Sequence, residues 1–442
     1  LGWGGNPGAP GRWPSGQGAA AVADPVRHCS LERRPLTSTH DTAAVASDPV
    51  LTERGERGTA LYVHFPFCAA KCTYCDFFSL PAGGQDLGGA LAALTTETLR
   101  RAPELPATVF LGGGTPSLYA ARELVQFLDR LQERTGFRQS ASEVTIECNP
   151  ESLDENKVEA LLGAGVNRFS IGVQSLRPDV LAWFGRVHSS EQGLRALRAA
   201  KRAGAQRVSA DLIYAFPGQS VEDWRTDLDR VLEVGLEHLS AYNLTYEEGT
   251  ALYRQLQQGR SAPLDEELEL QLFELTQERC RAHGLEAYEI SNYARPGGES
   301  RHNGIYWANL DYVGVGPSAV SRVGGARFGN PRSLGPWRAA IEAGKPAAAW
   351  LERPSELQRL GESWWLGLRR RVGVDSAEAA AAAGAPVAGS SAKCAERRAQ
   401  DLVEQGLLER KDGRYRLTAR GWPLADAVAR RFLDLARAPA AD

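Results

Sequence analysis

Six short runs rich in β-branched and aromatic residues recur between residues 60 and 247, and a stretch with helical periodicity follows each run. In two of these stretches, residues 153–164 and 191–203, apolar residues recur every three or four positions. A strand and a helix that alternate six times predict a parallel sheet covered by helices, either open or curled into part of a barrel. The runs read ALYVHF, ATVFLGGG, EVTIECNP, NRFSIGVQSL, RVSADLIYAFPG and HLSAYNLTYE.

The chain is long enough for more than this one unit, because 442 residues with 43% apolar content can form two or three domains. Residues 1–58 are rich in Gly, Pro, Ala and Ser. Because these residues also lack periodic apolar positions, we expect a disordered tail. The chain contains no Met, even at position 1, so a segment translated upstream of the true start is the alternative. We expect a barrel over residues 59–353, a second domain over 354–436 and a short tail over 437–442.

The overall charge and hydropathy exclude two kinds of partner. A net charge of −3 argues against a positive field spread over the surface, and hence against nucleic acid. No apolar run approaches the roughly 20 residues of a membrane-spanning helix. We therefore expect neither a nucleic-acid partner nor a membrane span.

Unusual residues gather where the predicted strands end. In parallel α/β folds, ligands bind at the carboxyl ends of the strands, which share one edge of the sheet. These residues are Cys68, Cys72 and Cys75 after the first strand, Gly112 to Gly114 after the second, Glu147 and Asn149 after the third, Gln174, Asp211 and Thr245 on or after the others.

The three clustered cysteines have the spacing C-x3-C-x2-C. Three thiolates can bind one face of a cubic iron–sulfur cluster and leave one iron open, whereas a structural zinc site needs four ligands. His64 is an alternative fourth ligand, but it lies within a strand run and is better interpreted as a packed, hydrogen-bonding residue. Single cysteines elsewhere indicate a reducing compartment, and we expect the cytoplasm; they are Cys29, Cys148, Cys280 and Cys394.

With this triplet after its first strand, the chain resembles the radical S-adenosylmethionine (radical SAM) superfamily, whose fold is a partial (β/α)6 barrel. The resemblance implies that Cys68, Cys72 and Cys75 hold a [4Fe–4S] cluster whose open iron binds S-adenosylmethionine. For the unusual residues at the other strand ends, the alternatives are a tight glycine turn in LGGGTPSL and ordinary surface polar residues. The cofactor contacts that the resemblance implies are Tyr62, Gly113, Gly114, Thr115, Glu147, Gln174, Arg186, Asp211 and Thr245, with Arg186 suited to the carboxylate.

Longer segments from about residue 60 to residue 435 are similar to two branches of this superfamily, the coproporphyrinogen dehydrogenases and the HemW-type heme chaperones. These segments include DLIYAFPGQS and YEISNYARPGGESRHNGIYW. Phe77 stands where the dehydrogenases carry a fourth cysteine, and HNGIYW matches the chaperones' H-N-x-x-Y-W motif. The resemblance implies heme ligation by His302, although a histidine that caps a loop between domains is the alternative. Val320 replaces a histidine of the family, so heme binding could be weaker or differently ligated.

From about Pro354 the pattern predicts two helices, a hairpin that turns at Asp412 and Gly413, and a final helix. This order is typical of a winged-helix domain. The segment carries 15 Lys and Arg against 12 Asp and Glu, a surplus too small to indicate DNA binding. The resemblance likewise implies a domain that packs on the barrel.

These observations favour a cytoplasmic radical SAM heme chaperone with a [4Fe–4S] cluster, S-adenosylmethionine and heme as its ligands. Its expected partners are an electron donor and heme-requiring respiratory proteins that accept heme. The rival function is a dehydrogenase that oxidatively decarboxylates coproporphyrinogen III through a 5′-deoxyadenosyl radical. A DNA-binding regulator that uses the winged helix is a third alternative.

Overall fold

The six predicted strands form the centre of the fold. The computed structural model describes residues 49–52, 55–386, 389–433 and 435. The six strands are hydrogen-bonded in chain order and all run parallel, which confirms the partial (β/α)6 barrel. They are β1 (Ala60–Phe65), β4 (Thr108–Gly113), β5 (Glu143–Cys148), β6 (Arg168–Gln174), β7 (Val208–Tyr214) and β8 (His238–Asn243).

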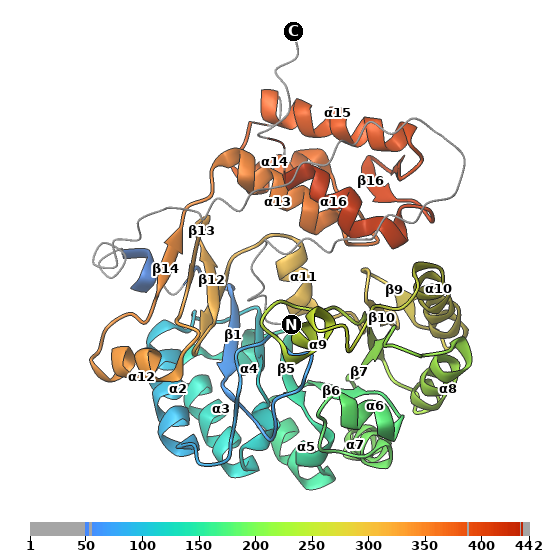
Figure 1. Ribbon diagram of the computed structural model, residues 1–442. Helices are drawn as coiled ribbons and strands as arrows, with labels where there is room; N and C mark the ends of the chain where they lie inside the picture. Colours follow the sequence, from blue (N-terminus) through green and yellow to red (C-terminus); the bar gives the residue numbers. More distant parts are fainter. Residues whose placement is uncertain (1–48, 53–54, 387–388, 434, 436–442) are drawn as a thin grey trace.

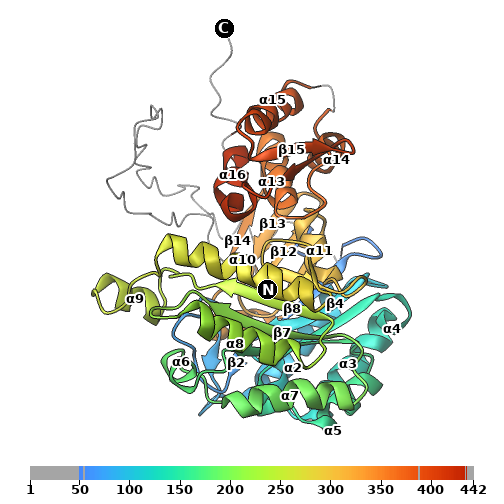
Figure 2. The same ribbon diagram turned by 90° about the vertical axis from the view of Figure 1, so that its right-hand side faces the viewer.

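Amphipathic helices cover the outer face of this sheet, as Figures 1 and 2 show. In α7, for example, Ser189 caps the first turn, while Leu194 and Leu197 turn inward to the core. The covering helices are α2 (Leu87–Arg101), α3 (Ala121–Thr135), α5 (Glu155–Gly163), α7 (Ser190–Arg202), α8 (Val221–Leu232) and α10 (Glu266–Ala282). Shorter helices in the connections are η2 (Pro116–Leu118), α4 (Phe137–Ser140), η3 (Pro150–Ser152), α6 (Pro178–Trp183) and α9 (Ala251–Gln257).

Six more strands widen the sheet at both edges. On one side β11 (Tyr312–Val315) pairs in parallel with β1, and β12 (Val320–Val323), β13 (Ala326–Gly329) and β14 (Trp350–Glu352) follow in antiparallel order. On the other side β10 (Asn292–Ala294) and β9 (Glu286–Ala287) continue from β8. Within the described residues β1 and β8 do not pair, so the barrel is open.

Three smaller elements complete this part of the chain. The pair β2 (Phe67–Cys68) and β3 (Leu80–Pro81) lies outside the main sheet. Helix α12 (Leu334–Glu342) packs against α2, and helix α11 (Arg301–Trp307) lies between the sheet and the C-terminal helices (Figure 1).

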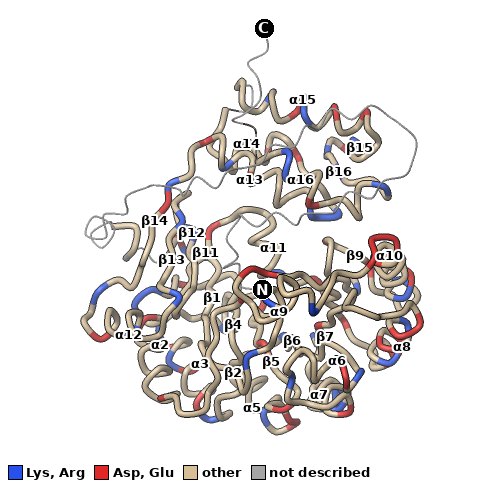
Figure 3. Tube along the Cα trace, in the orientation of Figure 1, with Lys and Arg blue, Asp and Glu red and all other residues tan. Residues whose placement is uncertain are grey.

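The C-terminal part forms a second hydrophobic core. Two helices, a hairpin and a final helix follow one another as predicted, but a further helix, α13 (Glu356–Leu368), precedes them and was not predicted. Asp412 and Gly413 both have positive φ, 52° and 77°, as a two-residue hairpin turn requires. Figure 3 shows basic and acidic residues mixed over this part. Its elements are α13 (Glu356–Leu368), α14 (Ser376–Ala383), α15 (Ser390–Glu404), β15 (Leu408–Lys411), β16 (Arg414–Leu417), η4 (Trp422–Leu424) and α16 (Ala425–Leu433).

The N-terminal tail expected over residues 1–58 differs from the structure at its end. Pro49–Thr52 form the short helix η1, and Val50 and Leu51 are buried in the barrel core. These two apolar side chains lie in a Gly- and Pro-rich sequence with no periodicity, so the pattern did not reveal them. Residues 1–48 and 436–442 lie outside the described residues. No helix in the described ranges is long and apolar enough to cross a membrane.

Candidate metal centre at the carboxyl edge of the sheet

The three clustered cysteines lie in one loop that follows β1. Cys68 ends β2, and Cys72 and Cys75 lie between β2 and β3, all three half-buried with free thiols. Burial raises the pKa of the Cys68 thiol, and it raises that of Cys75 to about 12 although the positive charge of Lys71 opposes this rise. Metal binding to this loop would therefore release protons.

The thiols are close together without being arranged around a common point. Among the described residues, no three His, Cys, Asp or Glu side chains already have the geometry of a metal site. The chemistry of the donor set nevertheless fits a cluster, because three thiols share one loop and act on each other's ionisation.

Contacts with distant segments fix the middle of the loop. Thr73 donates its backbone N–H to Phe184 (2.9 Å) and its hydroxyl to the Trp183 carbonyl (3.1 Å), and its own carbonyl accepts from Leu252 (2.8 Å). The Tyr74 ring packs edge-on against Phe184, with 4.8 Å between centroids. Helices α6 and α9 thus hold the loop at the edge of the sheet.

His64 fixes the end of the loop, as expected of a hydrogen-bonding strand residue. Its Nε2 lies 2.8 Å from the Phe78 carbonyl, which can only accept, so Nε2 carries the proton and Nδ1 accepts from the Tyr62 hydroxyl (3.0 Å). Burial lowers the pKa of His64 to about 4, which keeps the ring neutral. Tyr62 is consequently buried in β1 with its hydroxyl directed along the strand toward the loop.

A chain of polar contacts joins two of the cysteines across the strand ends. Arg186 donates from Nη1 to the Cys72 sulfur (3.5 Å) and from Nη2 to Asn149 Oδ1 (2.8 Å). Asn149 in turn donates from Nδ2 to Thr115 Oγ1 (3.0 Å), and Thr115 lowers the pKa of Cys68 by a hydrogen bond that partly offsets burial. Arg186 and Thr115, both expected at the cofactor, therefore lie at the cysteine loop, with Asn149 between them.

The glycines after β4 are required by packing against the cysteine segment. Gly113 has φ +100°, and a Cβ there would come within 2.4 Å of the His64 ring. A Cβ on Gly114 would meet the Phe67 carbonyl oxygen at 2.6 Å, and its N–H donates to the Phe65 carbonyl. These glycines therefore allow β4 to pack closely against β1 and the start of the loop, and their contact with S-adenosylmethionine stays a prediction.

The remaining expected contacts lie deeper or farther out. Glu147 accepts from the Gly113 N–H (2.9 Å), and the Asp211 carboxyl accepts from the Ser170 hydroxyl (3.0 Å) with a pKa that burial raises. Gln174 ends β6 in a left-handed conformation, φ 66°, at a register shift. Thr245 is exposed in the connection after β8.

His302 occupies the opposite end of the barrel. It is fully buried in α11, with Nδ1 2.7 Å from the Thr108 hydroxyl and Nε2 2.8 Å from the Tyr306 hydroxyl. Burial lowers its pKa to about 3, so the ring is neutral. Because hydrogen bonds occupy both nitrogens, His302 does not fit the role of a heme ligand in this conformation.

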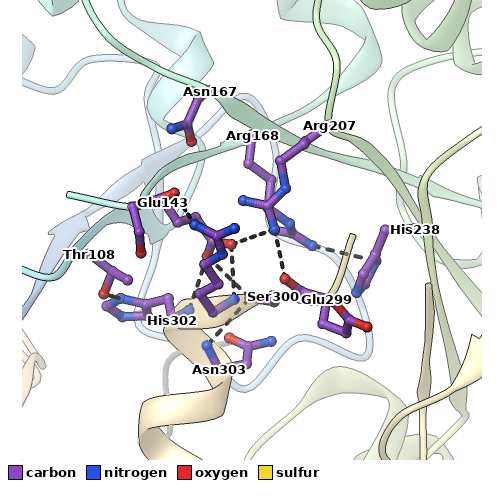
Figure 4. A network of polar contacts seen from close by, with 12 residues as sticks. Thr108, Glu143, Asn167, Arg168, Arg207, His238, Glu299, Ser300, His302 and Asn303 are labelled. Carbon is purple, nitrogen blue, oxygen red and sulfur yellow. Dashed lines mark hydrogen bonds and ion pairs between the residues drawn. The ribbon is translucent and has the colours of Figure 1, made fainter. Parts of the chain in front are cut away.

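Figure 4 shows why this end is closed: the start of α11 binds Glu143, the first residue of β5. The Glu143 carboxylate accepts from the backbone N–H groups of Arg301 (2.9 Å) and His302 (3.0 Å) and pairs with Arg207 (2.8 Å). Arg168, the first residue of β6, lowers the pKa of Glu143 together with Arg207, against the effect of burial. The amino ends of the strands and α11 form one buried network.

A narrow pocket opens between the cysteine loop and strands β11 and β12. Two positions singled out in the sequence, Phe77 and Val320, both line it, and so does Tyr306, which also covers His302. Arg332 spans its rim and donates to the Asp76 carbonyl (2.6 Å). The full lining is Tyr62, His64, Asp76, Phe77, Phe78, Tyr306, Tyr312, Ser318, Val320 and Arg332.

Several residues of this region were not assigned from the sequence. Asn149, Glu151, His188 and Arg332 gain their roles only from contacts between segments far apart along the chain. For Asn149, Glu151 and His188 the only signal was their position beside assigned residues, in ECNPE and FGRVH, and Arg332 had no such signal.

A three-cysteine loop after the first strand of an open (β/α)6 barrel is the architecture of a radical SAM protein. Comparison with known proteins agrees: the Radical SAM superfamily profile matches residues 62–231, and the HemN C-terminal domain profile matches residues 355–424. The structure is similar to that of coproporphyrinogen III oxidase (HemN) from Escherichia coli, with a TM-score of 0.73 over 85% of this chain and 90% of that one. At 22% identity, this likeness concerns the fold.

Curated relatives are closer in sequence. The protein named heme chaperone HemW of Bacillus subtilis is 33% identical over 84% of this chain and 98% of its own length. The Mycobacterium tuberculosis protein of the same name is 36% identical over 84% and 94%. A mouse protein, mitochondrial radical S-adenosyl methionine domain-containing protein 1, is 35% identical over 78% and 79%. The chain belongs to the HemW family of the radical SAM superfamily.

Proposed function

We propose that this chain is a heme chaperone that holds a [4Fe–4S] cluster and S-adenosylmethionine, binds heme and passes it to heme-requiring respiratory proteins. Cys68, Cys72 and Cys75 would bind the cluster, and an external donor would reduce it. When bound, the two cofactors can supply an electron and a 5′-deoxyadenosyl radical. Two relatives carry the name heme chaperone, which supports this function over the dehydrogenase.

The arrangement around the cysteine loop supports the cofactor part of the proposal. Arg186 is a permanent cation that contacts Cys72, and its guanidinium can also pair with the carboxylate of an amino acid. Glu147 and Asp211 add negative charge deeper in the barrel, where an amino group or ribose hydroxyls can be bound. The site thus offers complementary groups for both ends of S-adenosylmethionine.

The observation that carries the heme part is the pocket beside this loop. Phe77 occupies the position of the dehydrogenases' fourth cysteine, and its ring lines the pocket together with Phe78 and Tyr306. Aromatic side chains suit the face of a porphyrin, and Arg332 at the rim suits a propionate. The pocket is narrow, so heme would enter only as the loop and the β11–β12 edge separate.

The proposed heme contact is therefore at Phe77 and Val320, and ligation by His302 would require α11 to move. For His302 to bind iron, the hydrogen bond at the ligating nitrogen, either to Thr108 or to Tyr306, must open. Neutral imidazole is a good axial ligand once free, so this role stays a proposal that the experiment below separates from the pocket.

The test is a heme titration followed by absorption, with transfer to an apo-acceptor as the second readout. Val320→Asp should weaken heme binding about tenfold, because a carboxylate in the pocket opposes both the porphyrin face and its propionates. Val372→Asp is the matched control, since Val372 is 46% exposed in the C-terminal part. His302→Gln should change the absorption band only if the imidazole binds iron. Equal heme affinity in both valine variants would refute the pocket.

A second assay distinguishes the proposed heme chaperone from the rival dehydrogenase. Supplied anaerobically with reductant, S-adenosylmethionine and coproporphyrinogen III, the protein should yield no protoporphyrinogen IX, although slow uncoupled cleavage of the cofactor is compatible with the proposal. Sustained decarboxylation of the tetrapyrrole, identified by mass, would establish the dehydrogenase instead.

A further inference from the structure

Two chain segments run beside each other at the carboxyl ends of β5 and β6, and two side-chain contacts join them at alternate residues. Asn149 and Glu151 lie on the first segment, and Arg186 and His188 lie on the second. Asn149 Oδ1 accepts from Arg186 Nη2 at 2.8 Å, and Glu151 Oε2 lies 3.6 Å from His188 Nδ1. The contact between Glu151 and His188 therefore supports the contact between Asn149 and Arg186, and the latter contact holds Arg186 near Cys72.

The hydrogen bonds of His188 fix where its protons must be. Its Nε2 lies 3.1 Å from the Val173 carbonyl oxygen, which can only accept, so Nε2 carries a hydrogen. In a neutral ring Nδ1 would then be an acceptor that faces the Glu151 carboxylate, another acceptor. Within the described part of the chain neither Nδ1 nor Oε2 has a hydrogen-bond partner, and the His188 side chain is fully buried. The contact between Glu151 and His188 is therefore attractive only when one more proton is bound to one of the two side chains.

The surrounding charges favour the ionised form of Glu151. Burial raises the pKa of Glu151, but the neighbouring His188 and the positive charge of Arg186 lower it by more, so the net direction is down and Glu151 is a carboxylate. Glu191, at the start of α7, is exposed and bonds the serines at the α7 N-terminus.

We infer that Glu151 and His188 are a proton-dependent positioning pair, which keeps Arg186 aligned on Cys72 and on the carboxylate of S-adenosylmethionine. This inference rests on the proposed cofactor site. When the pair loses its proton, the carboxylate repels the lone pair of Nδ1 and the second contact is lost. Arg186 then keeps Asn149 and the Gly172 carbonyl as hydrogen-bond partners, but it loses the support of the Glu151–His188 contact.

The first measurement uses the metal-free protein and needs no cofactor. The ¹⁵N NMR signals of the histidine rings, with His188→Ala to assign residue 188, should show both His188 nitrogens protonated at neutral pH. In Glu151→Gln the amide N–H can donate to Nδ1, so His188 should be neutral. A neutral His188 in the wild-type protein would overturn the inference, whether or not S-adenosylmethionine binds.

The second measurement is the affinity of the reconstituted protein for S-adenosylmethionine from neutral to alkaline pH. As pH rises from neutral to alkaline, the affinity of the wild-type protein should fall about tenfold more than the affinity of Glu151→Gln. In that variant the contact with His188 needs no additional proton. His188→Ala should bind weakly throughout. Glu155→Gln is the control, because Glu155 pairs with Arg202 on the exposed surface of α5 and α7.

The outcomes separate the two proposals. If the wild-type protein holds no cofactor at any pH, the proposed function fails, and the NMR result still decides the state of His188. If the protein binds S-adenosylmethionine and Glu151→Gln follows the wild-type pH profile, the positioning role of the pair is refuted.

Discussion

Replacing Glu143 by alanine tests the buried network that holds α11 against the barrel. The side chain is fully buried and satisfies two backbone N–H groups, at 2.9 and 3.0 Å, besides its pair with Arg207. Removing it leaves Arg207 and Arg168 without their buried anion. Breaking a buried ion pair by removing one partner costs about 3–5 kcal/mol, and the unpaired amides place the expected loss near the upper end.

The assay is denaturant unfolding of the full chain, followed by circular dichroism. Asp129→Ala is the matched control: Asp129 pairs with Arg138 at 2.6 Å, but both side chains are partly exposed, so the loss should stay below about 1 kcal/mol. Equal losses in the two variants would show that the network contributes nothing beyond a surface pair.

The pH dependence of this difference has a definite sign. The pKa of Glu143 is lowered in the folded state, because Arg168, Arg207 and two backbone N–H groups together outweigh burial. Its contribution to the free energy of unfolding is therefore complete above the ordinary carboxyl pKa and is lost as pH falls through the lowered value. The wild-type protein and Glu143→Ala should converge in acid, and a gap that widens there would contradict the assignment.

Two further predictions concern the cofactor site. Anaerobic reconstitution should load about four irons per wild-type chain, and Cys72→Ser should abolish this loading while Cys394→Ser retains it; full loading of Cys72→Ser would refute the ligand assignment. Asp211→Ala should keep the iron but weaken S-adenosylmethionine binding by about 1.5–3 kcal/mol in calorimetry, more than Thr245→Ala at its exposed position. Equal affinities in the last two variants would place the pocket elsewhere.

The strands that could be predicted were those that are long enough to show a pattern and that alternate with helices. Each of the six central strands has six or seven residues and is followed by a helical stretch, so the βα repeat was visible. Strands β11 to β14 have three or four residues each and no helix between β11 and β13. Such short runs are not distinguishable from loops by periodicity. They are defined only by their pairing, β11 with β1 and each of the others with the strand before it.

The site was predictable where function requires a local spacing and was hidden where it requires distant contacts. The cysteine triplet occupies eight consecutive positions, so its spacing alone indicated a cluster. The pairing of Glu151 with His188 joins residues on different segments, and no local pattern marks it. His302 shows the reverse case, because a motif typical of heme binding lies in a buried hydrogen-bond network whose closure depends on Glu143.

Helix α11 also belongs to the C-terminal part of the molecule. The Arg369 guanidinium lies over the Trp307 ring, 5.1 Å from its centroid, and Asn309, just beyond the helix, donates to Ser363 in α13 at 3.1 Å. Because this short helix contacts both the barrel and the C-terminal part, the chain is not suited to being divided between these two parts. A fragment ending before α13 would expose Trp307 to water and free the C-terminal end of α11 from its support. The boundary between the two cores is thus visible in the sequence but is not a suitable place to divide the chain, and any shortened protein for crystallisation or display should retain residues on both sides of it.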